Sequence, residues 1–130
     1  MTLKQLLAAV LFETGNDADD LGDFQPHLTD YINEGYDRLV KAFTGEHVSE
    51  ESENYPPLVH EKSQPCLPSW AHRAIADYAA WMIYRNGSVQ KQSRGHAFLR
   101  SFEEATAKLR NEAGRRSTSS AGGRFTNIPW

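Results

Sequence analysis

Apolar side chains recur at steps of three and four residues in four separate segments of this chain, which is the spacing of an amphipathic helix. The first segment runs from about Thr2 to Phe12, and Thr2 is placed to act as its N-cap. No strand pattern of useful length and no internal repeat is visible. The apolar positions of this segment are Leu3, Leu6, Leu7, Val10 and Leu11.

The second helical segment follows a polar, turn-rich stretch at residues 15–23. Pro26 is expected in the first turn of the helix, where a missing N–H is tolerated. The periodic pattern begins at Leu28 and ends at Phe43, and Gly45 is placed to terminate the helix. The apolar positions are Leu28, Tyr31, Ile32, Tyr36, Leu39, Val40 and Phe43.

The third helix is the most apolar and is therefore expected to be largely buried. It opens at the sequence Leu-Pro-Ser-Trp, residues 67–70, and runs to Arg85 before the turn at Asn86 and Gly87. A fourth helix is expected from about Ser88 to Ala113, and the short turn makes the two helices antiparallel. The aromatic residues Trp70, Tyr78 and Trp81 have the spacing of packing residues rather than of platforms for stacking bases.

These patterns predict an all-α fold: a small bundle of about four helices with a long acidic loop and an extended C-terminal tail. Residues 1–113 form the helical domain, and residues 46–66 form the loop within it. A segment of that length without periodicity is usually functional or disordered. The residues expected to be mostly buried are Leu6, Leu7, Ile32, Leu39, Ile75, Tyr78, Met82, Phe102 and Leu109.

Residues 114–130 form a separate tail in which a polar tether leads to an apolar hook. The hook residues are Phe125, Ile128 and Trp130, and each would gain roughly 1.5–3 kcal/mol if buried. A flexible tether over residues 114–123 has a root-mean-square reach of about 16–19 Å. The hook either folds back on its own domain as a clasp or docks on a neighbouring subunit or another protein.

Composition places the chain among ordinary soluble proteins, with 130 residues, 39 % of them apolar and 24 % charged. Cys66 is the only cysteine, so no intrachain disulfide is possible and a reducing cytosol fits. Neither a signal peptide nor a membrane-spanning stretch is expected.

Charge divides the chain into two halves of opposite sign. Residues 1–67 carry 4 Lys/Arg against 13 Asp/Glu, giving −9, and residues 68–130 carry 10 against 4, giving +6. The two halves could fold together, copies could pair head to tail, or the basic half could face nucleic acid.

Candidate chemistry is weak throughout the sequence. An EF-hand loop starting at Asp17 would place Leu21 and Leu28 where oxygen ligands are required. The five histidines are scattered, and a Cys66–His72 pair has no third group to orient it. No phosphate-binding loop or nucleophile elbow occurs, so we expect neither an enzyme, a metal site nor a cofactor.

Basic residues of the fourth helix and tail could contact phosphate groups of nucleic acid. Their interleaving with Glu103, Glu104 and Glu112 is more typical of a solvated or subunit-facing helix surface. The basic residues are Arg94, Arg100, Lys108, Arg110, Arg115, Arg116 and Arg124.

Three stretches resemble the small helical head-to-tail connector, or adaptor, proteins of tailed bacteriophages and prophages. They are the opening Leu-x-x-Leu-Leu helix, the segment Phe24–Leu39 with its Tyr-Ile-Asn-Glu-Gly-Tyr motif, and the segment Leu67–Arg85 with its Leu-Pro opening. The likeness spans roughly residues 3–112 and includes no catalytic signature. The acidic stretch from Glu46 to Glu61 has no counterpart in the resemblance.

The resemblance implies a structural virion protein of the phage neck that is assembled in the bacterial cytoplasm and has no cofactor. Such proteins form a ring, commonly of twelve copies, between the portal and the stopper or tail-completion protein, close to the DNA exit channel. By this likeness Phe125, Ile128 and Trp130 would reach a neighbouring copy or the portal, with Arg115, Arg116 and Arg124 as polar anchors.

Two other classes of function are open to this sequence. A small helical DNA-binding regulator would present an exposed recognition helix and bind duplex DNA in a salt-sensitive manner. A free-standing helical interaction module would stay monomeric at all concentrations.

Overall fold

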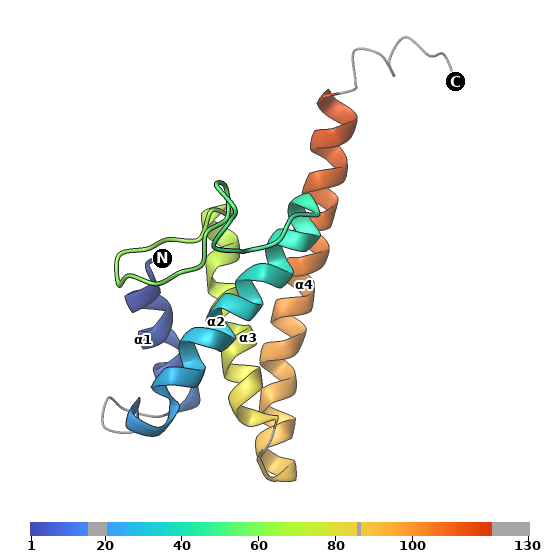
Figure 1. Ribbon diagram of the computed structural model, residues 1–130. Coiled ribbons are helices and arrows are strands. Elements are labelled where there is room, and N and C mark those ends of the chain that lie inside the picture. The colour runs from blue at the N-terminus through green and yellow to red at the C-terminus, as the bar shows by residue number, and fades with distance from the viewer. Residues whose placement is uncertain (16–20, 86, 121–130) are drawn as a thin grey trace.

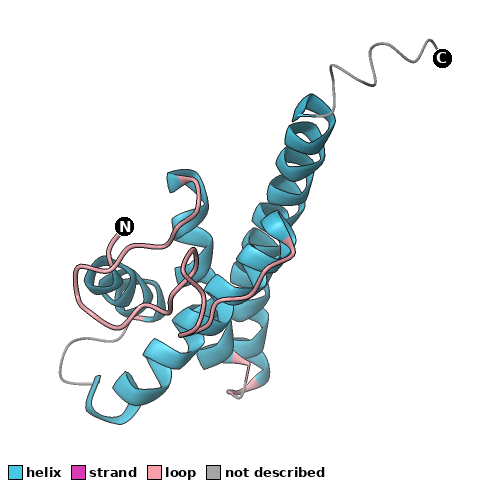
Figure 2. Cartoon of the chain, turned by 45° about the horizontal axis from the view of Figure 1, so that its top comes forward, coloured by secondary structure: helices cyan, strands magenta, loops and turns pink. Residues whose placement is uncertain are grey.

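The computed structural model describes residues 1–15, 21–85 and 87–120 of the chain, and within these ranges it contains helices and no strand (Figures 1 and 2). Four α-helices follow one another as α1 (Leu3–Thr14), α2 (Leu21–Thr44), α3 (His72–Tyr84) and α4 (Val89–Ser120). A single 3₁₀ turn, Ser69–Ala71, leads into α3. The prediction of an all-α helix bundle is confirmed. No helix in these ranges is both long and apolar enough to cross a membrane.

The N-terminus of α1 is fixed by the predicted cap. The Thr2 side chain accepts a hydrogen bond from the backbone N–H of Gln5, and the Gln5 side chain accepts one from the backbone N–H of Thr2. This reciprocal arrangement satisfies two of the donors that a helix start leaves free. At the other end Gly15, with φ of +72°, closes the helix in a conformation that favours glycine.

Helix α2 begins seven residues earlier than the sequence pattern predicts, at Leu21 instead of Leu28. Pro26 is therefore its sixth residue and lies outside the first turn. The acidic residues Asp19 and Asp20 directly precede the helix in the sequence, and negative charge at this end favours helix formation. The other end agrees with prediction, because α2 stops at Thr44 and Gly45 follows with φ of +79°.

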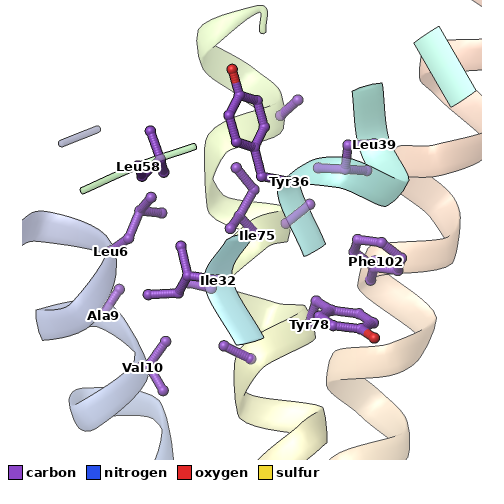
Figure 3. Packing of buried hydrophobic residues seen from close by; sticks show 14 of the residues in the cluster. Leu6, Ala9, Val10, Ile32, Tyr36, Leu39, Leu58, Ile75, Tyr78 and Phe102 are labelled. Atoms are coloured by element: carbon purple, nitrogen blue, oxygen red, sulfur yellow. The ribbon is translucent and has the colours of Figure 1, made fainter. Parts of the chain in front are cut away.

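Helix α3 lies at the centre of the bundle and packs against each of the other three α-helices (Figure 1). Side chains from α1, α2 and α4 converge on it, as the sticks in Figure 3 show. Of the nine residues predicted to be buried, eight are, and Leu7 is partly buried against the same cluster. The eight are Leu6, Ile32, Leu39, Ile75, Tyr78, Met82, Phe102 and Leu109.

Two glycines permit neighbouring helices to approach α3 closely. A Cβ atom on Gly35 of α2 would lie 3.0 Å from Cδ1 of Tyr78, and a Cβ atom on Gly95 of α4 would lie 2.8 Å from Cε3 of Trp81. Both distances are shorter than side chains normally allow, so a larger residue would push α2 or α4 away from α3.

The segment between α2 and the 3₁₀ turn contains neither helix nor strand, yet it is tied to the bundle. The Asn33 side chain donates to the Leu58 carbonyl at 3.0 Å and accepts from the Leu58 N–H at 2.7 Å. The N–H of Leu3 donates to the Ser63 carbonyl at 2.8 Å. Leu58, which is 2 % exposed, thereby enters the core between α1 and α2 (Figure 3).

Helix α4 continues to Ser120, seven residues beyond the predicted end at Ala113. The predicted flexible tether over residues 114–123 is therefore wrong for residues 114–120, which are helical. Gly114 costs a helix only about 1 kcal/mol relative to alanine, and the arginines that follow it are good helix formers. Extending an existing helix also avoids the cost of nucleating a new one.

Replacing Met82 by Asp is expected to prevent folding. The Met82 side chain is 6 % exposed in the central helix, and an unpaired buried charge costs more than a domain of this size can absorb. Met82→Leu preserves volume and should shift stability by less than about 1.5 kcal/mol. Thermal melts followed by circular dichroism compare the two variants, and a cooperative, unshifted transition for Met82→Asp would contradict the assigned core.

Candidate interaction surfaces

The C-terminal part of α4 projects beyond the bundle as a helical arm, which we define as residues 110–120 (Figures 1 and 2). Leu109 is the last buried residue of α4 among those whose side chains are described. At about 1.5 Å of rise per residue, the arm carries the chain roughly 16 Å past Leu109. The arm therefore carries the chain, as far as Ser120, away from the core of its own domain.

The predicted hook falls only in part within the described structure. Arg115 lies on the arm and is exposed. Arg116 belongs to α4, but its side chain lies outside the description, as do Arg124 and all three apolar hook residues, Phe125, Ile128 and Trp130. Because α4 ends at Ser120, only residues 121–124 separate the arm from the hook.

A groove of about 600 Å³ lies between the C-terminal half of α2 and the facing side of α4. Phe102 and Thr106 of α4 line it together with charged residues of both helices. The anionic side chains of the groove are engaged locally: Glu34 pairs with Arg38 at 3.6 Å, and Asp37 accepts from the backbone N–H of Val48 at 2.8 Å. The full lining is Glu34, Asp37, Arg38, Lys41, Ala42, His47, Phe102, Thr106 and Arg110.

Two cations of this groove have no anionic partner within the described ranges. Lys41 and Arg110 are both exposed, and neither belongs to an ion pair there. Arg38, in contrast, pairs with Glu34, and its guanidinium lies 5.4 Å from the centre of the Tyr78 ring. Both contacts hold its positive charge in position. The groove thus offers two cations that belong to no ion pair of the described residues, and its lining carries three Lys or Arg against two carboxylates.

The loop after α2 presents the opposite charge. Its glutamates are exposed, and none of the ion pairs found in the described part of the chain involves one of them. The loop itself is held in place through Leu58 and its neighbours, so these carboxylates stand on an anchored segment. The glutamates are Glu46, Glu50, Glu51, Glu53 and Glu61.

Trp70 lies at the surface, contrary to the expectation that it packs in the central helix. It belongs to the 3₁₀ turn before α3, and 37 % of its surface is exposed. Lys108 of α4 places its Nζ 4.0 Å from the centre of the Trp70 ring. This cation–π contact uses one face of the indole and ties the turn to α4.

The Cys66–His72 pair weighed as a nucleophile and base does not form a catalytic arrangement. Both ring nitrogens of His72 are engaged, Nε2 with the Leu67 carbonyl at 2.9 Å and Nδ1 with the Met1 amino group at 2.6 Å. Burial lowers the pKa of His72, an effect that the hydrogen bond to Leu67 partly opposes. Cys66 is exposed, and its backbone N–H donates to the Tyr36 hydroxyl at 2.8 Å.

Metal binding finds no support in the described residues, among which no group of three His, Cys, Asp or Glu side chains converges. The acidic stretch considered for calcium lies largely outside them, since residues 16–20 are not described.

Comparison with known proteins identifies no relative of this chain. No protein-family model matches the chain, and neither the curated proteins nor the solved structures contain a match to it. The resemblance to phage connectors therefore rests on the sequence segments that carry it.

The helical arm leads to a test at Gly114, which has no atom within 4 Å of the position that a Cβ would take. If the arm is helical, Gly114→Ala should increase the helical signal and stabilise the helix by up to about 1 kcal/mol, and Gly114→Pro should reduce the signal. Circular dichroism of the two variants beside the wild type measures this. Equal helical signals for all three proteins would show that residues 114–120 are not helical.

Proposed function

We propose that this protein is a structural virion component that forms a ring-shaped adaptor between the portal and the stopper or tail-completion protein of a tailed phage. The resemblance to head-to-tail connectors and the all-α bundle support this proposal. The observation that supports it most is the helical arm, which carries the chain as far as Ser120 away from the core of its own domain. A ring of this kind in the phage neck surrounds part of the DNA exit channel.

The arm and the short spacer favour docking of the hook outside its own bundle. Fully extended chain spans at most about 3.6 Å per residue, so Phe125 lies within roughly 18 Å of Ser120. That distance is about the length of the arm, so a hook that folded back on its own bundle would have to reverse direction at Ser120, and only Ile128 and Trp130 could extend well past Leu109, the last buried residue of α4 among those whose side chains are described. A neighbouring copy or the portal can receive Phe125, Ile128 and Trp130 without reversing the chain.

Contacts between copies are proposed to join the two oppositely charged surfaces. The cations Lys41 and Arg110 of one copy would face the loop glutamates of the next, because both sets lack ion partners within the described monomer. Complementary charge orients partners and rejects like-charged faces, although each exposed pair contributes little energy. The apolar hook would supply the larger share of the association energy.

Deleting residues 121–130 is expected to leave the melting temperature nearly unchanged and to abolish assembly with neighbouring copies or with the portal of the same phage. The deletion starts beyond α4 and beyond Leu109, the last buried residue among those whose side chains are described. A full-length variant with Phe125, Ile128 and Trp130 replaced by Ser is the matched control and should behave alike. Calorimetry measures stability, and native mass spectrometry together with electron microscopy of portal mixtures measures assembly. A lower melting temperature with normal assembly would identify the hook as an intramolecular clasp.

Charge reversal tests the pairing of copies separately from the hook. Self-association of the wild type should weaken with added salt, since the Debye length is about 10 Å at 0.1 M and shorter above it. Lys41→Glu with Arg110→Glu should lose association, and mixing with a Glu50→Lys, Glu51→Lys, Glu53→Lys protein should restore it as a mixed oligomer. Glu104→Lys, at an exposed position of α4 that does not line the groove, is the control. Association that strengthens with salt, or no rescue on mixing, would refute this interface.

A further inference from the structure

A buried carboxylate with an unpaired oxygen lies where the C-terminal end of α1 meets α3. The Glu13 side chain is only 8 % exposed. Arg73 of α3 donates from Nε to Glu13 Oε1 at 2.6 Å, and its Nη2 contacts the same oxygen. The second oxygen, Oε2, is buried and has no hydrogen-bond partner among the described residues. A buried acceptor without a donor is costly, so this oxygen requires an explanation.

Asp77 is placed to provide the missing donor. It follows Arg73 by four residues on α3, so the two side chains lie on the same face of the helix, one turn apart. Tyr84, a further seven residues along, reaches the Glu13 carbonyl with its hydroxyl at 3.5 Å. The end of α1 therefore lies along the α3 stripe that contains Arg73, Asp77 and Tyr84.

We propose that Glu13 and Asp77 share one proton, and that this shared proton latches the C-terminal end of α1 onto α3. The proton gives Glu13 Oε2 a donor and leaves one negative charge on the pair, which Arg73 neutralises. Loss of the proton leaves two negative charges facing one cation that is itself half exposed. The latch then weakens through repulsion between the carboxylates and through the unpaired buried oxygen.

The electrostatic surroundings agree with a shared proton at neutral pH. Burial, reinforced by the charge of Glu13, raises the pKa of Asp77 to about 7, while Arg73 opposes the rise. Lys4, the only other charged residue of α1, lies at the opposite end of that helix. The remaining titratable groups of α3 are His72, Tyr78 and Tyr84, and among the described residues Arg73 is the cation that acts on Asp77.

The sign of the resulting pH dependence follows from proton linkage. Between the ordinary pKa of 3.8 and about 7, the folded state keeps a proton that the unfolded chain has released. Stability therefore falls as the pH rises through this window and levels off above it. With one linked proton, the folding equilibrium constant falls by up to about tenfold per pH unit, and by less where water reaches Asp77.

The test compares denaturant unfolding of the wild type and Asp77→Asn from about pH 4 to about pH 9. An amide at position 77 donates permanently to Glu13 Oε2 and does not titrate, so this variant should lose the fall seen in the wild type and be the more stable protein at high pH. Glu104→Gln removes an exposed carboxylate of α4 and should keep the wild-type profile. Parallel profiles for the wild type and Asp77→Asn would overturn the shared proton and indicate that water satisfies Oε2.

Carbon-13 NMR titration of the wild-type carboxyl groups gives a second readout that does not depend on any variant folding. A shared proton predicts one apparent pKa near neutrality for the Glu13–Asp77 pair, with both carboxyl resonances responding to that titration. Two independent titrations below about pH 5 would overturn the proposal.

Discussion

The structure depends on the burial of α3, whose surface is covered by three other helices. Alanines at positions 74, 76, 79 and 80 let those helices approach, and larger side chains such as Ile75 and Met82 fill the remaining space. Such a helix can carry charge only where a neighbour compensates it. Its two charged residues, Arg73 and Asp77, stand one turn apart and meet the single acidic residue of α1, Glu13. The proton-sharing pair is thus a consequence of where the central helix tolerates charge.

The same close packing determines the groove between α2 and α4. Gly35 lets Tyr78 come against the α2 backbone, and the Tyr78 ring centre lies 4.9 Å from that of Phe102. Arg38 of α2 lies over the Tyr78 ring, and Phe102, which is in ring contact with Tyr78, lines the groove. A larger residue at position 35 would move α2 outward and reshape the surface proposed to receive a neighbouring copy.

Hydrophobic periodicity was sufficient to predict the four helices, their order and most of the core, because each helix buries one continuous stripe or, for α3, nearly its whole surface. Helix ends were predictable where a specific residue determines them, as Thr2 and Gly45 do. They were not predictable at Leu21 or Ser120, because the residues that continue the helix there do not follow the three- and four-residue apolar spacing and include Pro26 and Gly114, which usually mark helix ends. Trp70 was placed in the central helix because the apolar pattern of α3 extends back to it, whereas it belongs to the 3₁₀ turn before α3 and contacts Lys108 at the surface.

The candidate sites depended still more on tertiary neighbours. Glu13 lies just past the predicted end of the first helix and nothing in the sequence marks it, so only its contact with Arg73 reveals a buried carboxylate. The groove could likewise not be predicted without knowing which faces of α2 and α4 meet.

The helical arm is not stabilised by the core. Eleven residues are too few for a stable isolated helix in water, and no described side chain beyond Leu109 is buried. The arm is helical because it continues α4, which is already formed. It therefore extends the helix in a fixed direction while contributing little to the core. A helical arm that extends from the bundle without contributing to its core is suited to a contact outside the monomer, and the proposed ring gives it that role.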